Sequence, residues 1–140
     1  MTKDFLYNFI RQHKYGVISS VSNDNTAQSA CIGFVVTPDL KLIFDTVTDS
    51  RKYKNILLNP NVSFVIGCDN EQTVQYEGKA EILANEELEH LLVTYFEEFP
   101  DGKDRRQNWK NIVYFLVEPK WIRYSEFNST SPIIEEIRNK

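Results

Sequence analysis

The sequence has few of the residues that mark secreted, zinc-binding or membrane-spanning proteins. It holds only two cysteines, Cys31 and Cys68, without a CxxC spacing. A disulfide framework or a zinc site is therefore not expected, and both residues are predicted to be buried free thiols. No apolar run approaches the roughly 20 residues that cross a bilayer, and residues 1–4 lead into an amphipathic stretch rather than a secretion signal. We expect a cytoplasmic protein without membrane contact.

The chain also lacks an excess of positive charge. Its 16 lysines and arginines face 20 aspartates and glutamates, which gives a formal net charge of −4 and a pI near 5.2. Nucleic-acid modules carry a basic surface, so no nucleic-acid partner is expected. The two histidines, His13 and His90, have no metal-ligand partner at helical spacing or in a nearby cluster. No metal site is predicted.

What the sequence does contain describes one domain over residues 1–140. Apolar residues make up 41% and aromatic residues 13%, which is enough for a core, while the length is too short for two. Apolar periodicity indicates helices and short strands. The predicted helices cover 5–10, 53–57 and 88–99, the last with Asn85 as its cap. The predicted strands cover 16–21, 27–36, 42–46, 62–67, 73–82, 112–117 and 121–125.

One predicted strand, 73–82, alternates between apolar and polar residues more cleanly than the others. The residues predicted to face the core are Val74, Tyr76, Gly78, Ala80 and Ile82. Residues 103–106 are expected to form a charged surface loop. The apolar residues of 133–137 are expected to form a short helix or a segment that docks a dimer partner.

Together these elements predict a mainly β fold: a six- to seven-stranded antiparallel split β-barrel with peripheral helices. Short connections favour antiparallel neighbours, and closure of the sheet removes exposed edges. Such a small barrel is filled by its own side chains. A sizeable ligand must therefore lie outside it, in a cleft against a loop, a helix or a second subunit.

The segment that leads into the helix at 53–57 is a candidate phosphate site. Asp49 or Ser50 is available as the helix cap, and Arg51 and Lys52 follow. The start of a helix offers unpaired N–H groups and a positive dipole end, and both favour a phosphate. Ser50 adds a hydroxyl, Arg51 a two-pronged donor and Lys52 a point charge. The alternative is an ordinary capped helix whose basic residues are solvated.

Several short motifs occur around this segment in a fixed order. They are Gly16-Val17-Ile18-Ser19-Ser20, Phe44-Asp45-Thr46, Ser50-Arg51-Lys52, Asn59-Pro60-Asn61-Val62-Ser63 and Gly78-Lys79-Ala80-Glu81. This order resembles the pyridoxamine 5′-phosphate oxidase-like superfamily of FMN-binding split barrels. The resemblance is in register over about 15–81 and looser over the rest of the chain.

The resemblance implies FMN as the cofactor, bound in the groove between the subunits of a homodimer. The cofactor-binding residues that it implies are Asp45, Thr46, Ser50, Arg51, Lys52 and Thr73. In that family the Ser-Arg-Lys triplet grips the FMN phosphate, and the Asp-Thr pair corresponds to the strand end beside the flavin. Thr73 falls where oxidase members often carry a glutamine that bonds the isoalloxazine edge, and a threonine hydroxyl has a shorter reach.

The chain departs from true pyridoxamine phosphate oxidases at their substrate contacts. Residues 133–137 replace the Arg-x-His-Asp-Arg-type segment with which those enzymes end. Phe99 aligns with their substrate-phosphate arginine, and apolar Ala30 and Val35 align near basic residues of their second strand. Oxidation of pyridoxamine phosphate is therefore not expected. The chain resembles the small, general stress protein-type members instead.

These observations predict an FMN-dependent oxidoreductase with a small-molecule substrate or a reductant such as NAD(P)H. Because the cofactor carries the hydride or electron chemistry, no catalytic residue is predicted. Three alternatives stay open. One is a non-catalytic, stress-associated flavin-binding protein. Another is a heme-binding or heme-degrading relative, which requires a histidine axial ligand. The third is a protein that uses the deazaflavin F420, which requires a wider basic groove.

Overall fold

The computed structural model describes residues 1–128 and 130–139, and only the backbone of Asn85. Its elements, in chain order, are α1 (Lys3–Arg11), β1 (Tyr15–Val21), β2 (Ala27–Gly33), β3 (Val35–Val36), β4 (Leu42–Val47), α2 (Arg51–Leu58), β5 (Asn61–Ile66), β6 (Gln72–Ile82), α3 (Asn85–Glu98), α4 (Gly102–Asn108), β7 (Ile112–Glu126) and β8 (Ile133–Arg138). No helix among these residues has the length and apolarity to span a membrane.

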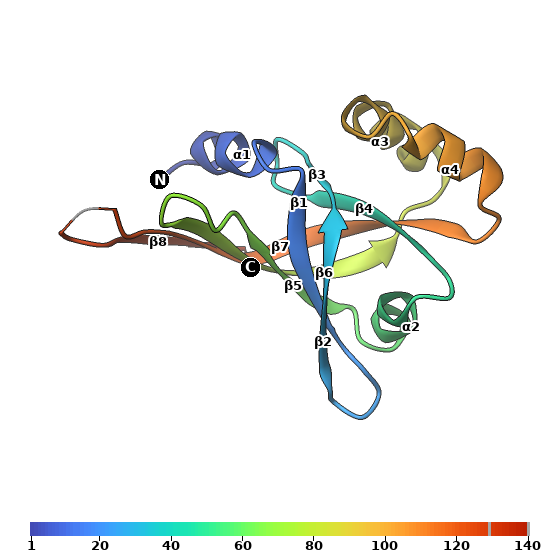
Figure 1. The fold of residues 1–140 in the computed structure, drawn as a ribbon, viewed down its shortest axis with the longest axis horizontal. Coiled ribbons are helices and arrows are strands. Elements are labelled where there is room, and N and C mark those ends of the chain that lie inside the picture. The colour runs from blue at the N-terminus through green and yellow to red at the C-terminus, as the bar shows by residue number, and fades with distance from the viewer. Residues whose placement is uncertain (129, 140) are drawn as a thin grey trace.

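The strands form one antiparallel sheet in the order β2-β1-β5-β6-β7-β4-β3, with β8 paired to β7 (Figure 1). The two ends of this order, β2 and β3, follow each other in the chain and are separated only by Phe34. The sheet therefore curls back on itself. The result is the predicted split β-barrel, with helices only at its periphery.

The predicted strand over 27–36 is two strands in the structure. Phe34 interrupts it, and the Phe34 backbone N–H donates to the carbonyl of Lys14 at 3.2 Å. Before this break, β2 pairs with β1, and after it, β3 pairs with β4. The break thus lets one segment serve both ends of the sheet.

The two strands predicted over 112–117 and 121–125 are in fact one strand, β7. Glu77 of β6 pairs with Trp121, but the next residue, Gly78, pairs with Pro119. Lys120 is therefore an extra residue in a bulge. A proline cannot donate to the ladder and is tolerated at such a bulge, so Pro119 does not end the strand.

Three further expectations are corrected by the structure. Residues 103–106 belong to helix α4 rather than a loop, and 133–138 form strand β8 rather than a helix. Glu136 of β8 accepts hydrogen bonds from Trp121 and Arg123 of β7, which favours the paired strand. Cys31 and Cys68 are free thiols, as predicted, but both are exposed.

Two apolar clusters lie on opposite faces of the sheet. The larger fills the barrel beneath α1 and includes Phe44, Phe64, Tyr76 and Phe115. Val74, Tyr76 and Ala80 of β6 belong to it as predicted. Gly78 is buried as predicted, whereas Ile82 is exposed. The smaller cluster holds α3 against β3, β4 and β7 and contains the residues Val35, Ile43, Leu83, Leu92, Tyr95, Phe99, Tyr114 and Leu116.

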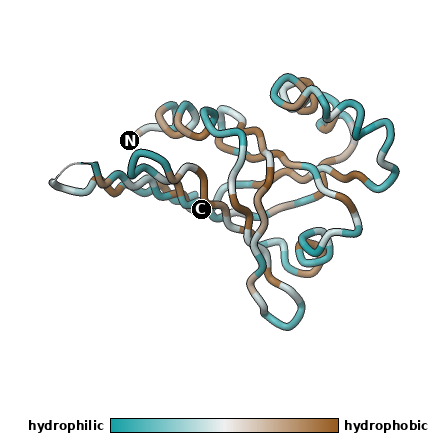
Figure 2. The backbone as a smooth tube through the Cα atoms, viewed as in Figure 1, coloured by the Kyte–Doolittle hydropathy of each residue, from teal (hydrophilic) through white to brown (hydrophobic). Residues whose placement is uncertain are grey.

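Helices α3 and α4 project from the side of the sheet, and α4 is almost wholly hydrophilic (Figure 2). Ala84, rather than the predicted Asn85, holds the N-cap position of α3, and the Asn85 side chain lies outside the description.

Candidate functional site

Helix α2 begins with a cap that ties it to the end of β4. Of the two candidates, Ser50 is the cap: its Oγ accepts the Tyr53 backbone N–H at 3.2 Å. The same oxygen accepts the Thr46 hydroxyl at 2.9 Å, and the Ser50 N–H donates to the Val47 carbonyl at 3.0 Å. These bonds fix the strand-to-helix turn and the direction of the first helical N–H groups.

A small hollow lies between the start of α2 and the ends of β1 and β2. Its volume is about 90 Å³, and its lining residues are Ile18, Ser20, Gln28, Ser29, Ala30, Arg51 and Lys52. At roughly 30 Å³ per water molecule, this is room for about three waters, which is the scale of one phosphate group. The hollow combines hydroxyl and amide groups from the sheet with two cations from the helix.

Neither of these cations has a carboxylate partner in the described part of the chain. Arg51 is exposed and Lys52 is half-buried, and no ion pair within 4.0 Å involves either of them. Burial lowers the pKa of the Lys52 ammonium, against a weaker opposing effect of the Asp45 charge. A half-buried charge without a counter-ion is unfavourable, and an anion in the hollow would offset this cost.

Buried Asn55 connects α2 to the two strands beneath it. Its Nδ2 donates to Ser20 Oγ at 3.0 Å and to Gln28 Oε1 at 2.9 Å. Sequence reasoning missed these three residues, although two signals were available. Ser20 occupies an inward position of β1 in step with Gly16 and Ile18, and Asn55 is a polar residue next to the apolar face of α2.

Asp45 points away from this hollow. Successive residues of a strand face opposite sides, so Thr46 faces α2 while Asp45 faces the α3–α4 pair. There the Asp45 carboxylate accepts from Arg105 of α4 at 3.0 Å, and Arg105 also bonds Asp101 at 2.7 Å. Burial, with the Asp45 charge as a second cause, raises the pKa of the Tyr95 phenol.

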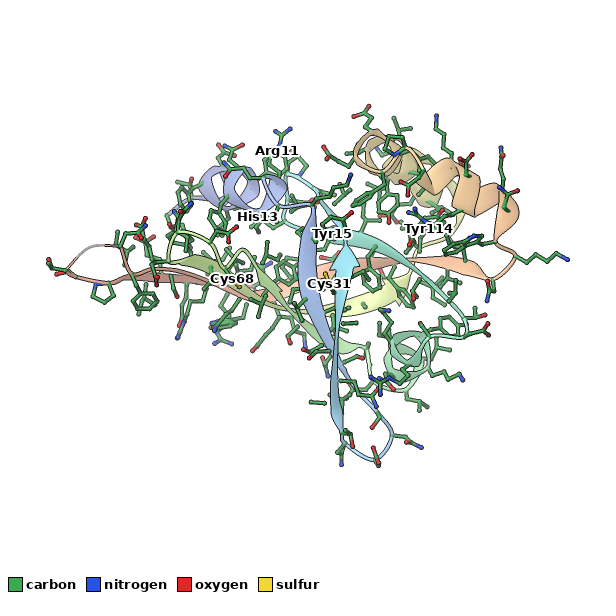
Figure 3. All side chains as sticks on the ribbon, viewed as in Figure 1. Arg11, His13, Tyr15, Cys31, Cys68 and Tyr114 are labelled. Carbon is green, nitrogen blue, oxygen red and sulfur yellow. The ribbon has the colours of Figure 1, made fainter. Side chains whose placement is uncertain are left out.

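Tyr114 lies beneath the same two helices (Figure 3). Its pKa is also raised, chiefly by burial and then by Asp45, and its buried hydroxyl has no hydrogen-bond partner among the described residues.

Thr73 lies apart from α2. It pairs with Ser125 near the β8 end of the sheet. Ser19 lies next to the hollow on β1, and the row of paired residues that starts there crosses β5 and reaches β6 at Glu77. The four intervening steps along β6 amount to about 13 Å. The Thr73 Oγ1 atom is buried without a hydrogen-bond partner in the described ranges.

Of the six predicted residues, the structure therefore gathers Thr46, Ser50, Arg51 and Lys52 at one place. Asp45 lies on the other face of the sheet and Thr73 at its other end. No group of three or more histidine, cysteine or acidic side chains suited to a metal is present in residues 1–128 and 130–139.

The family model described as pyridoxamine 5′-phosphate oxidase matches residues 2–126, nearly the whole chain. The chain belongs to this family. A comparison with curated protein sequences gave no match. The resemblance drawn from the sequence motifs is thereby confirmed, and solved structures agree with it.

General stress protein 26 from Bacillus anthracis shares 25% identity with the chain, covers 98% of it over 98% of its own length, and gives a TM-score of 0.72. HutZ, a heme storage protein from Vibrio cholerae, shares 16% identity, covers 83% over 88% of its own length, and gives a TM-score of 0.71. ChuZ from Campylobacter jejuni shares 16% identity and gives a TM-score of 0.80, and the match covers 96% of this chain and 58% of ChuZ. At 16% identity these last two similarities show the shared fold alone.

Proposed function

We propose that this protein binds FMN, with the cofactor phosphate in the hollow at the start of α2, and acts as an oxidoreductase. The observation that carries the proposal is the pair of cations, Arg51 and Lys52, beside a phosphate-sized hollow with no carboxylate partner among the described residues. Helix α2 adds the N–H groups of its first turn that the Ser50 cap does not use. Membership of the pyridoxamine 5′-phosphate oxidase family supports the choice of FMN over other phosphates.

In this proposal each residue of the site has a distinct task. Arg51 supplies charged hydrogen bonds to the phosphate. Lys52 supplies a positive charge, and a bound anion would raise the pKa of its ammonium back toward the ordinary value. Thr46 and Ser50 hold the turn that aims the helix at the hollow. Thr73, whose buried hydroxyl lacks a partner in the described structure, is the candidate for a bond to the edge of the flavin ring. Bound FMN supplies hydride or electron transfer.

Asp45 was predicted to bind the cofactor, and the structure gives its carboxylate another partner. Its carboxylate is already bonded to Arg105, so we propose that it holds α4 against the face of the sheet that points away from the hollow.

We further propose a homodimer that uses the outward face of β1, β2 and β5. Val17 pairs with Cys31 on one side and with Val65 on the other, and these three exposed side chains form a row across the strands. Val17 is 40% and Val65 is 39% exposed. An aliphatic row in the middle of a sheet face is typical of an interface rather than of a solvated surface.

The dimer is tested by Val65→Glu, which places a charge in this row. We expect the wild-type protein to have the mass of a dimer in light scattering and the variant to have the mass of a monomer. A wild-type monomer, or a variant that stays dimeric, would contradict the proposed interface.

The visible absorption spectrum of the freshly purified protein tests the cofactor. FMN predicts flavin bands that disappear when NAD(P)H or another reductant is added under anaerobic conditions. The competing function is heme binding, favoured by the similarity to the heme storage protein HutZ, and it predicts a Soret band instead. His13 is poorly placed as an axial ligand. The bond from its Nδ1 to the Phe9 carbonyl would leave Nε2 to bind the iron, but Nε2 lies against Gly67. A flavin that is bound but is not reduced by NAD(P)H would indicate the non-catalytic alternative.

A further inference from the structure

The polar groups on the sheet side of the α2 hollow have a defined hydrogen-bond polarity. Asn55 is 6% exposed, and both hydrogens of its side-chain amide are used, one on Ser20 and one on Gln28. In each of these bonds the partner's oxygen is the acceptor. Serine and glutamine side chains can each donate and accept hydrogen bonds. Asn55 uses the acceptor oxygen of each partner and leaves its donor group unused.

This arrangement leaves the donors of both partners available. Ser20 accepts at Oγ, so its own O–H is free to donate, and no acceptor for it occurs in the described structure. Gln28 accepts at Oε1, which directs Nε2 away from Asn55, and Nε2 likewise has no acceptor among the described side chains. Both residues line the hollow. A pair of free donors beside two unpaired cations is suited to an anion and unsuited to a cation or an apolar group.

We propose that Ser20 and Gln28 are additional ligands for the cofactor phosphate, and that Asn55 is the positioning residue that makes both of them donors. The inference rests on the proposed function and refines the same site. Arg51 and Lys52 approach the hollow from the helix side. Ala30, the neighbour of these donors on the sheet side, offers no polar group. Ser29, the other polar residue of the lining, bonds Ser19 through its hydroxyl. Ser20 and Gln28 therefore supply the free donors on the sheet side of the hollow.

Asn55→Asp tests the positioning role with almost no change in shape. A carboxylate only accepts hydrogen bonds, so Ser20 and Gln28 would turn their donors toward it and away from the phosphate. We expect the Kd for FMN to rise at least tenfold. We expect the Kd for riboflavin, which has the same ring but no phosphate, to change less than twofold. Asn8→Asp, an exposed site on α1 with the same charge change, is the matched control and should alter neither Kd.

Asn55→Asp also adds a negative charge near the phosphate, whereas Gln28→Met removes the Nε2 donor without changing the charge. Gln28→Met also serves as the test if Asn55→Asp does not fold. It should weaken FMN about tenfold, the scale of a lost hydrogen bond to a charged group, and leave riboflavin unchanged. If Asn55 acts through Gln28, Asn55→Asp should cost less affinity in the Gln28→Met background than in the wild type.

The outcomes separate this inference from the function on which it rests. Equal weakening of FMN and riboflavin would show that Asn55 is only structural, and unchanged FMN binding in both variants would show that these donors do not reach the phosphate. Either result overturns the inference and leaves the proposed function intact. A wild-type protein that binds FMN no better than riboflavin overturns the proposed function itself.

Discussion

Replacing Arg51 with alanine should weaken FMN binding by about tenfold. A hydrogen bond to a charged group contributes about 1.5–3 kcal/mol, and every 1.4 kcal/mol corresponds to a factor of ten in Kd. Arg51 is exposed at the rim of the hollow, so solvent screens it and the lower end of this range applies. Titration of the apoprotein with FMN, followed by quenching of flavin fluorescence, measures the change directly.

Lys54→Ala is the matched control for this variant. Lys54 lies on the same helix, is also exposed, and is not among the residues that line the hollow. It should leave the Kd for FMN within about twofold, because a distant surface charge contributes little. Raising the salt concentration should shrink the effect of Arg51→Ala. Equal effects of the two substitutions would mean that Arg51 acts only through the overall charge, and this would refute its role as a phosphate ligand.

Three further predictions concern the fold around the site. Asp45→Ala should lower the free energy of unfolding by about 2 kcal/mol, because it leaves Arg105 without its half-buried partner. Asp101→Ala removes the exposed partner and should cost less than about 0.5 kcal/mol, and equal losses in urea denaturation would contradict this. Lys52→Met should raise the melting temperature of the apoprotein at pH 7. It should reduce the further rise in melting temperature that FMN binding causes. Because burial lowers the folded-state pKa of Lys52, the stabilising effect on the apoprotein should diminish as the pH rises through that pKa toward 10.5, and a pH-independent effect would argue against the buried charge. Gly78→Ala should destabilise the protein by about 1–3 kcal/mol in the same denaturation assay, since its Cβ would clash with a backbone carbonyl of β7 at the bulge; wild-type stability would exclude that close approach.

The barrel and the helix cap could be predicted because local patterns determine them. The alternation in 73–82 required a half-buried strand, and the serine before Arg51 required a helix start. The continuous β7 could not be predicted, because proline usually ends a strand and only the bulge opposite Gly78 accommodates Pro119. Helix α4 was missed for a similar reason: its apolar content is low, and Arg105 is held by Asp45, which is sixty residues away in the sequence.

The candidate site was predictable in part for the same physical reason. Ser50, Arg51 and Lys52 are adjacent in the sequence, so the motif itself places them together. Asn55, Ser20 and Gln28 meet only because α2 packs on β1 and β2, and no short motif encodes that contact. Asp45 was predicted to be a site residue because it precedes Thr46 in the sequence. Successive residues of a strand face opposite sides, however, so the two side chains point to different faces of the sheet.

The central claim is that the phosphate of FMN lies at the start of α2. Its most direct test is a crystal structure of the protein grown with excess FMN. We predict phosphate density in the hollow between α2 and β1–β2, within hydrogen-bond distance of Arg51 and Lys52. Bound FMN whose phosphate lies anywhere else would contradict the account.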